Sequence, residues 1–168
     1  EAARAQIVKE TIIPALARGA VVLLDRFYDS TVAYQAYGRG LPVSFVHQAN
    51  VFACQGVHPC RTILLTTEAP AEEGLERATH HGDADRLEQA GADFHAHVNS
   101  AFMRIAAENP QRIRVVSSAG SKDKTARTIF KELSDIFSWD ASSPVWQPGF
   151  FESILERNTD KKAQINLG

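Results

Sequence analysis

The pattern of hydrophobic and polar positions predicts an α/β domain. Three short apolar runs, at 20–25, 61–67 and 113–118, indicate strands, and none alternates strictly between apolar and polar residues. Such runs are typical of strands covered on both faces, as in a parallel sheet. Apolar residues at helical spacing lie before, between and after the three runs, at 1–19, 42–56, 69–81, 87–109 and 122–137. This order of elements is typical of an α/β fold.

The turn-forming residues divide the chain into a domain and a tail. Gly19 and Pro110 stand where the first and fourth predicted helices should stop, as expected for a glycine just past a helix and a proline that cannot continue one. After Phe137 comes a stretch with two prolines and a glycine, which predicts a linker. We therefore expect one domain over 1–137 and a linker with a C-terminal tail, partly disordered, over 138–168.

The start of the chain has no sign of a natural beginning. No Ser, Thr, Asn or Asp precedes the first helical pattern as a cap. The only methionine is Met103, so Glu1 is not an initiator residue. We therefore expect this sequence to be a piece of a longer protein.

Composition narrows the classes of function. The chain has 168 residues, 44% of them hydrophobic, and a net charge of −2. It is therefore large enough for one core, and its charge does not favour nucleic acid or an anionic membrane as a partner. No apolar stretch approaches the roughly 20 residues of a membrane span. Cys54 and Cys60 are too few for a disulfide scaffold and fit no zinc spacing, so we expect reduced thiols and a cytoplasmic protein.

The most informative residues follow the first predicted strand. Asp25 and Arg26 stand at its carboxyl end, where open α/β sheets bind ligands. An acid there can hold Mg²⁺ or its water, and an arginine can fork onto a phosphate. A salt bridge at the strand end or a helix cap would explain the pair equally. Hydroxyl, amide and aromatic side chains that could read a base or flank a sugar follow, ending in Gly38-Arg39-Gly40.

At this point the sequence resembles the thymidylate kinase family. The resemblance is carried by "DRFYDSTVAYQAYGRG" at 25–40, by "GLERATHHGDADRLEQ" at 74–89 and by "DFHAHVNSAFMRIAAENPQRIRVVSS" at 93–118, and it runs from about residue 2 to 137. It implies a P-loop NTPase-type three-layer α/β/α parallel sheet. Residues 1–137 would be the C-terminal two-thirds of the family's domain, with a lid at about 77–88.

The resemblance also implies an activity and a set of site residues. The activity is transfer of the γ-phosphate of ATP to dTMP, which gives dTDP for dTTP synthesis. Asp25 would organise Mg²⁺ indirectly, together with the acceptor phosphate, and Arg77 would stack on the adenine of ATP. Arg86 would reach across the phosphates as the lid closes, so that Asp25, Arg26, Arg77 and Arg86 form the catalytic set. The implied dTMP-binding residues are Arg4, Arg26, Ser30, Thr31, Tyr34, Gln35 and Arg39.

Within that set, the resemblance assigns individual contacts. Arg26 would bind the dTMP phosphate and Arg4 the edge of the thymine. Thr31 would face the N3 side of the base, and Tyr34 would lie against the deoxyribose, where its bulk disfavours a 2′-hydroxyl. Gln35 and Arg39 belong to the same acceptor-site loop. The family also implies a homodimer.

The chain departs from the family pattern in two places. It contains neither the G-x-x-x-x-G-K-[ST] loop on the family's first strand nor the R-E-P-G segment on its second. Thr79, His80 and His81 stand where bacterial relatives often have further lid arginines. The family sheet order 2-3-1-4-5 would leave 20–25 separated from 61–67 by a missing strand. We therefore expect this piece either to be unstable alone or to pair those two runs.

Two other interpretations stay open. The chain could be a non-catalytic relative that binds a nucleotide or a partner. It could also be another nucleoside or nucleotide kinase, although Thr31 with Tyr34-Gln35 argues against this.

Overall fold

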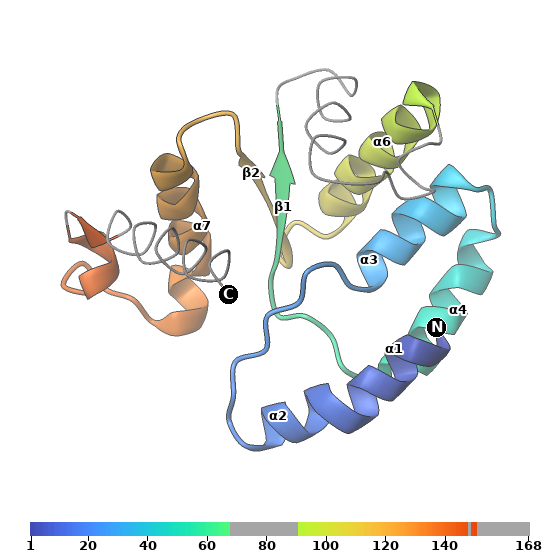
Figure 1. The fold of residues 1–168 in the computed structure, drawn as a ribbon, viewed down its shortest axis with the longest axis horizontal. Coiled ribbons are helices and arrows are strands. Elements are labelled where there is room, and N and C mark those ends of the chain that lie inside the picture. The colour runs from blue at the N-terminus through green and yellow to red at the C-terminus, as the bar shows by residue number, and fades with distance from the viewer. Residues whose placement is uncertain (68–90, 148, 151–168) are drawn as a thin grey trace, which may run out of the picture. The chain divides into compact units, whose positions relative to one another are not determined.

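The computed structural model describes residues 1–67, 91–147 and 149–150 (Figure 1). The chain divides into two compact units. The described parts of 1–62 and 69–113 make up the first unit, and those of 63–68 and 114–168 make up the second. No helix among the described residues is long and apolar enough to cross a membrane.

The first helix is continuous but changes its winding midway. It comprises α1 (Ala2–Ile7), a π-helical turn η1 (Val8–Ile12) and α2 (Ile13–Ala17). Pro14 is the second residue of α2, just after the wide turn; a proline has no N–H to donate, and its ring crowds the carbonyl four residues earlier, at Glu10. The helix ends as predicted before Gly19, whose φ of 76° suits a residue without a Cβ.

The prediction of a strand at 20–25 is wrong. This segment has no strand structure, and Val21 and Leu23 are 73% and 94% exposed. A strand is stable only when a neighbouring backbone pairs with its N–H and C=O groups, and no described segment does so. Of the two alternatives expected for this piece, the pairing of 20–25 with 61–67 is therefore also wrong, and its instability alone stays a prediction.

A helix follows this segment, where the family resemblance implies an acceptor-site loop. It consists of α3 (Tyr28–Thr31) and a π-helical continuation, η2 (Val32–Gly38). The predicted helix at 42–56 is confirmed as α4 (Val43–Cys54), and the helical pattern at 87–109 is confirmed from Ala92 as α6 (Ala92–Glu108).

These helices build the core of the first unit. η2 lies against α6 and α4, and α1 lies against α4. Gly38 lets η2 approach α6 closely, because a Cβ at this position would stand 2.8 Å from a ring carbon of Phe94. The buried apolar side chains of this core are Val8, Ile12, Val32, Ala33, Ala36, Val46, Ala53, Cys54, Val98, Ala101, Ile105 and Ala106.

The two other predicted strands are confirmed and form a parallel pair. They are β1 (Thr62–Thr66) and β2 (Ile113–Ser117). The N–H of Thr62 donates to the carbonyl of Arg112 at one end, and the N–H of Ser118 donates to the carbonyl of Thr66 at the other. Because the residue numbers of the hydrogen-bonded partners increase together along both strands, the strands run in the same direction.

The second unit contains the last predicted helix, confirmed as α7 (Lys122–Phe137). The hydroxyl of Ser121 accepts a hydrogen bond from the Lys124 N–H at 3.2 Å, which caps its first turn. After α7, the ring of Trp139 stacks between those of Phe130 and Phe137, with centroids 4.9 Å away on each side. A short 3₁₀ turn, η3 (Pro144–Trp146), follows. The aromatic stack holds the start of the 138–168 segment against the helix.

Candidate functional site

Arg4 and Thr31, predicted to read the same base, contact each other directly. Arg4 lies on α1 and Thr31 at the end of α3, and Arg4 Nη2 donates a hydrogen bond to Thr31 Oγ1. The continuous helix from α3 into η2 turns Thr31 toward α1. The structure therefore brings together two polar groups that stand 27 residues apart in the sequence.

Three further groups hold the Arg4 guanidinium. Its Nη1 lies 2.8 Å from both carboxylate oxygens of Glu1 and 2.6 Å from Oδ1 of Asn50 on α4. Its Cζ lies 5.4 Å from the centroid of the Phe27 ring, within the range of a cation–π contact. Arg4 is thus fixed by its own helix, by α4 and by the segment before α3.

A hollow of about 350 Å³ opens beside this contact. Arg4, Thr31 and Gln35 are the predicted site residues among those that line it. The lining also includes Leu41 and Phe45, so polar groups from two helices face a partly apolar wall. Small-molecule sites commonly combine an apolar wall with a few placed polar groups.

Arg26 and Tyr34 form a second contact between predicted site residues. The Cζ of Arg26 lies 5.5 Å from the centroid of the Tyr34 ring, so its cation lies over the aromatic face. Tyr34 is itself held by rings on α6, with centroids 6.1 Å from Phe94 and 6.0 Å from Phe102. Arg26 has a φ of 67°, uncommon for a residue with a Cβ, and such backbone conformations cluster at functional sites.

The other predicted site residues are less tightly placed. Asp25 and Arg39 are exposed and Ser30 is half-buried, and none of them lines the hollow. Arg77, Arg86 and the predicted lid at about 77–88 lie outside the described residues. Across 1–67 and 91–150, apart from 148, no group of three or more His, Cys, Asp or Glu side chains could hold a metal ion. The Mg²⁺ role of Asp25 therefore stays a prediction.

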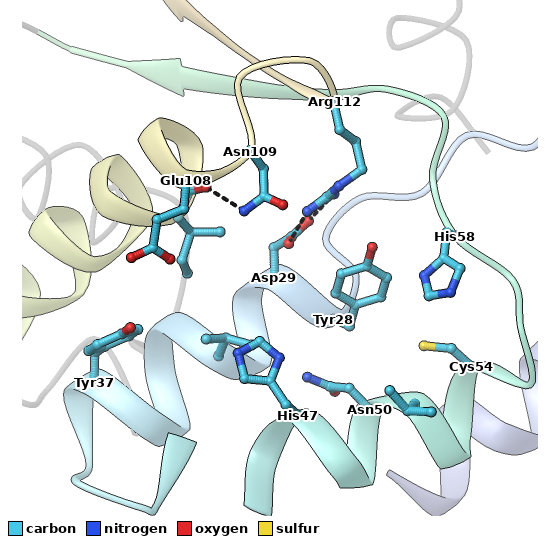
Figure 2. A pocket seen from close by; sticks show the side chains of 13 residues that line it. Tyr28, Asp29, Tyr37, His47, Asn50, Cys54, His58, Glu108, Asn109 and Arg112 are labelled. Atoms are coloured by element: carbon cyan, nitrogen blue, oxygen red, sulfur yellow. Dashed lines mark hydrogen bonds and ion pairs between the residues drawn. The ribbon is translucent and has the colours of Figure 1, made fainter. Parts of the chain in front are cut away.

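A second cavity, of about 240 Å³, lies between α3, α4 and the end of α6 (Figure 2). Figure 2 shows His47, Asn50 and Cys54 of α4 on one side and Asn109 and Arg112 on the other. Arg112 closes this cavity by forking onto Asp29, with N–O distances of 2.8 and 2.7 Å.

The charges in this cavity are compensated within the unit. The hydrogen bond to Asp29 raises the pKa of Arg112, although burial opposes the shift. Burial raises the pKa of Tyr28, whose ring lies 5.2 Å from the Arg112 Cζ. Burial also raises the pKa of the Cys54 thiol, with the Arg4 cation acting against it. Both cysteines carry free thiols.

Sequence reasoning missed three residues that organise these sites: Asp29, Arg112 and Asn50. Asp29 stands inside the quoted motif, but its partner is 83 residues away and no local pattern links them. Asn50 is the one polar residue among the buried positions of α4, but the helix also carries Ser44, His47 and Gln48, so the sequence gives no signal that singles it out.

The parallel strand pair and the alternating helices define an α/β protein, and the hollow that Arg4 and Thr31 line is its candidate small-molecule site. A sequence model of the thymidylate kinase family matches residues 1–129. Thymidylate kinase of Pediococcus pentosaceus is 41% identical over 139 residues, covering 82% of this chain and 66% of the relative. That of Synechococcus sp. is 45% identical over 127 residues, covering 76% and 59%.

A third relative, thymidylate kinase of Deinococcus radiodurans, is 41% identical over 134 residues, covering 80% of this chain and 64% of its own length. The chain belongs to the thymidylate kinase family, and its fold class is that of the P-loop NTPases. It spans about three fifths of the length of the curated relatives that it matches.

Proposed function

We propose that this chain carries the acceptor side of a thymidylate kinase, which binds dTMP and takes part in transfer of the ATP γ-phosphate to give dTDP. The observation that carries the proposal is the Arg4–Thr31 contact at the edge of a hollow of about 350 Å³. Family membership supports it independently.

The hydrogen-bonding capacity left on this pair suits thymine. An arginine has five N–H donors. The two on Nη1 of Arg4 point to Glu1 and Asn50, and one on Nη2 points to Thr31, which leaves one Nη2–H and the Nε–H. The Thr31 oxygen has one of its two acceptor positions occupied by Arg4. A free donor beside a free acceptor complements the O4 acceptor and N3–H donor of thymine, whereas cytosine presents the reverse order.

Arg26, Tyr34 and Asp25 would serve the phosphate and sugar. Arg26 would fork onto the dTMP phosphate, since its guanidinium can bind a phosphate in bidentate fashion and lies over the ring of Tyr34. Tyr34, braced by two phenylalanines, would lie against the deoxyribose and crowd a 2′-hydroxyl. Ser30, Gln35 and Arg39 would complete the acceptor site.

Asp25 can supply one oxygen ligand, directly or through water, and Mg²⁺ commonly binds through one or two carboxylates plus substrate phosphates. Bound there, Mg²⁺ would neutralise charge on the transferring phosphoryl group. Arg77 and Arg86 would contact the adenine and phosphates of ATP. Phosphoryl transfer depends on positioning and charge neutralisation rather than on a covalent nucleophile, so arginines suit this task. The cytoplasmic location expected from the two cysteines stays part of this proposal.

We also propose that the protein forms a homodimer through the outer side of α1 and α4. These helices contact each other, and Ile7, Val51 and Phe52 leave large apolar side chains exposed on them. Exposed apolar patches of this kind commonly mark protein interfaces. Replacing Phe52 by Asp should give a monomer in light scattering after size exclusion, and an unchanged mass would contradict the proposal.

Calorimetric titration with dTMP, dCMP and UMP tests the substrate. We expect dTMP to bind most tightly of the three. The Thr31→Val variant should bind dTMP more weakly, and Arg26→Ala should weaken the binding of dTMP far more than the binding of ATP. Tighter binding of UMP would overturn the assignment of Tyr34 and Thr31, and tighter binding of dCMP would overturn the base-edge argument. Because the chain has no G-x-x-x-x-G-K-[ST] loop, we expect it to show little or no turnover alone. Binding of dTMP without turnover in a coupled ADP-release assay, measured after that loop is restored upstream, would favour the non-catalytic alternative.

A further inference from the structure

Asn50 is a buried amide on a helix that otherwise packs apolar side chains. It lies on α4 between the buried residues Val46 and Ala53, and only 5% of it is exposed. Its Oδ1 is 2.6 Å from Nη1 of Arg4, which is 46 residues away in the sequence. The site residues implied by the family resemblance do not include it.

Arg4 determines which way the Asn50 amide faces. A guanidinium only donates hydrogen bonds, so the carbonyl oxygen of the amide must face it and the NH₂ group must face away. Nδ2 of Asn50 is buried and has no hydrogen-bond partner in the part of the chain that the structure describes. An unpaired buried donor is costly, so the contact with Arg4 outweighs the alternative flip of the amide.

The Asn50 contact adds a restraint from α4 to those that Glu1, Thr31 and Phe27 place on the Arg4 side chain. Arginine has many rotamers, and ordering it costs free energy. Asn50 holds Nη1 from α4 while Thr31 holds Nη2 from α3, so the plane of the Arg4 guanidinium is fixed from two helices. Glu1 also binds Nη1, but it lies on the helix of Arg4 itself and its side chain is 29% exposed.

We infer that Asn50 is a positioning residue for nucleotide recognition, which fixes Arg4 before the base arrives. This inference rests on the proposed binding of dTMP by Arg4 and Thr31. With Asn50 in place, the remaining Nη2–H of Arg4 keeps one direction at the hollow that Arg4 and Thr31 line. Without it, dTMP must order the side chain on binding, which should weaken affinity by about tenfold.

The experiment compares variants that differ in the oxygen at position 50. Asn50→Leu and Asn50→Ala remove the acceptor, and the second does so without adding bulk. Asn50→Asp keeps an acceptor and removes the unpaired donor. Each variant is checked for folding by circular dichroism, then examined by ¹⁵N NMR of the Arg4 guanidinium, with Arg4→Lys as the assignment control, and by calorimetric titration with dTMP.

We expect separate, slowly exchanging Nη signals for Arg4 in the original chain and in Asn50→Asp. Averaged signals and about tenfold weaker dTMP binding are expected in Asn50→Leu and Asn50→Ala. Unchanged Arg4 signals and unchanged affinity in the folded Leu or Ala variant would overturn the inference, as would loss of affinity with Arg4 still ordered. If the original chain binds no dTMP, the proposed function fails, while the NMR comparison still decides whether Asn50 orders Arg4.

Discussion

Replacing Asp29 by Ala should weaken the first unit strongly, because it leaves the Arg112 guanidinium largely without its partner. Asp29 stands in the first turn of α3, and Arg112 directly precedes β2. The fork has N–O distances of 2.8 and 2.7 Å, and the two side chains are 12% and 19% exposed. Arg112 would retain its 3.0 Å hydrogen bond to Thr62 Oγ1 and its contact with the Tyr28 ring, but no carboxylate among these partners.

The expected cost follows from this geometry. Removing one partner of a fully buried ion pair costs about 3–5 kcal/mol, since the remaining charge stays desolvated. The partial exposure of both side chains places the Asp29→Ala variant near the lower end, at about 3 kcal/mol. Asp29→Asn keeps one acceptor oxygen but loses the charge, so we expect about half of that loss.

Urea unfolding followed by far-ultraviolet circular dichroism measures the change in the free energy of unfolding. Hydrogen exchange of peptides from 28–38 and 92–108 shows whether the loss falls on α3, η2 and α6. The matched control is Glu108→Ala, which removes the partner of Arg104 from an exposed ion pair with a similar N–O distance of 2.9 Å. Exposed pairs contribute little, so this variant should unfold almost as the original chain does.

Two outcomes would refute the reasoning. The first is that Asp29→Ala is no more destabilising than Glu108→Ala, which would mean that the fork contributes no more than a surface pair. The second is that a double-mutant cycle with Arg112→Ala shows no coupling between positions 29 and 112.

Four further predictions concern other parts of the chain. Burial raises the pKa of the Cys54 thiol, so the folded protein holds this proton more tightly than the unfolded chain does. The stability that this difference contributes is complete below about pH 8.5 and should fall as the pH rises further. In thermal melts, the Cys54→Ala variant should lack that fall. A maleimide should label exposed Cys60 well before Cys54, and equal rates would show that α4 opens readily. Gly38→Ala should cost about 1–3 kcal/mol in urea unfolding, because the new Cβ would meet Phe94 at 2.8 Å; a neutral result would mean that α6 shifts freely. Trp139→Ala should lower the free energy of unfolding by about 1–3 kcal/mol, because it removes two aromatic contacts. Unfolding is followed by fluorescence, and an unchanged free energy of unfolding would show that the stack contributes nothing.

The elements that sequence reasoning located correctly are those with local signals. Apolar runs mark β1 and β2, and the expected stop before Gly19 is where α2 ends. The strand predicted at 20–25 has an equally apolar pattern, yet its state depends on a pairing backbone elsewhere. Hydrophobicity alone therefore identifies a segment that is able to form a strand, but it does not tell whether a neighbouring strand is there to pair with it.

The candidate site was predictable as far as its residue types and the family resemblance reach. Arg4 with Thr31, and Arg26 with Tyr34, are contacts between residues already singled out. The residue that holds Arg4 was not predictable, since Asn50 becomes informative only when α4 is laid against α1. Asp29 was hidden for the same reason, because its importance lies in a partner far along the chain.

The π-helical turn at Val8–Ile12 has a consequence for how this chain tolerates insertions and deletions. A π-turn holds one residue more than the α-helical turn that it replaces. Deleting a residue there would return the turn to α-helical winding, so Arg4 would keep nearly its angular position relative to Pro14 and would still face Thr31. Deleting a residue within α1 or α2 would instead rotate the two ends of the helix against each other by about 100°. The wide turn thus absorbs one extra residue without changing which side of the helix faces Thr31, and a deletion should be tolerated at Val8–Ile12 better than in the α-helical turns beside it.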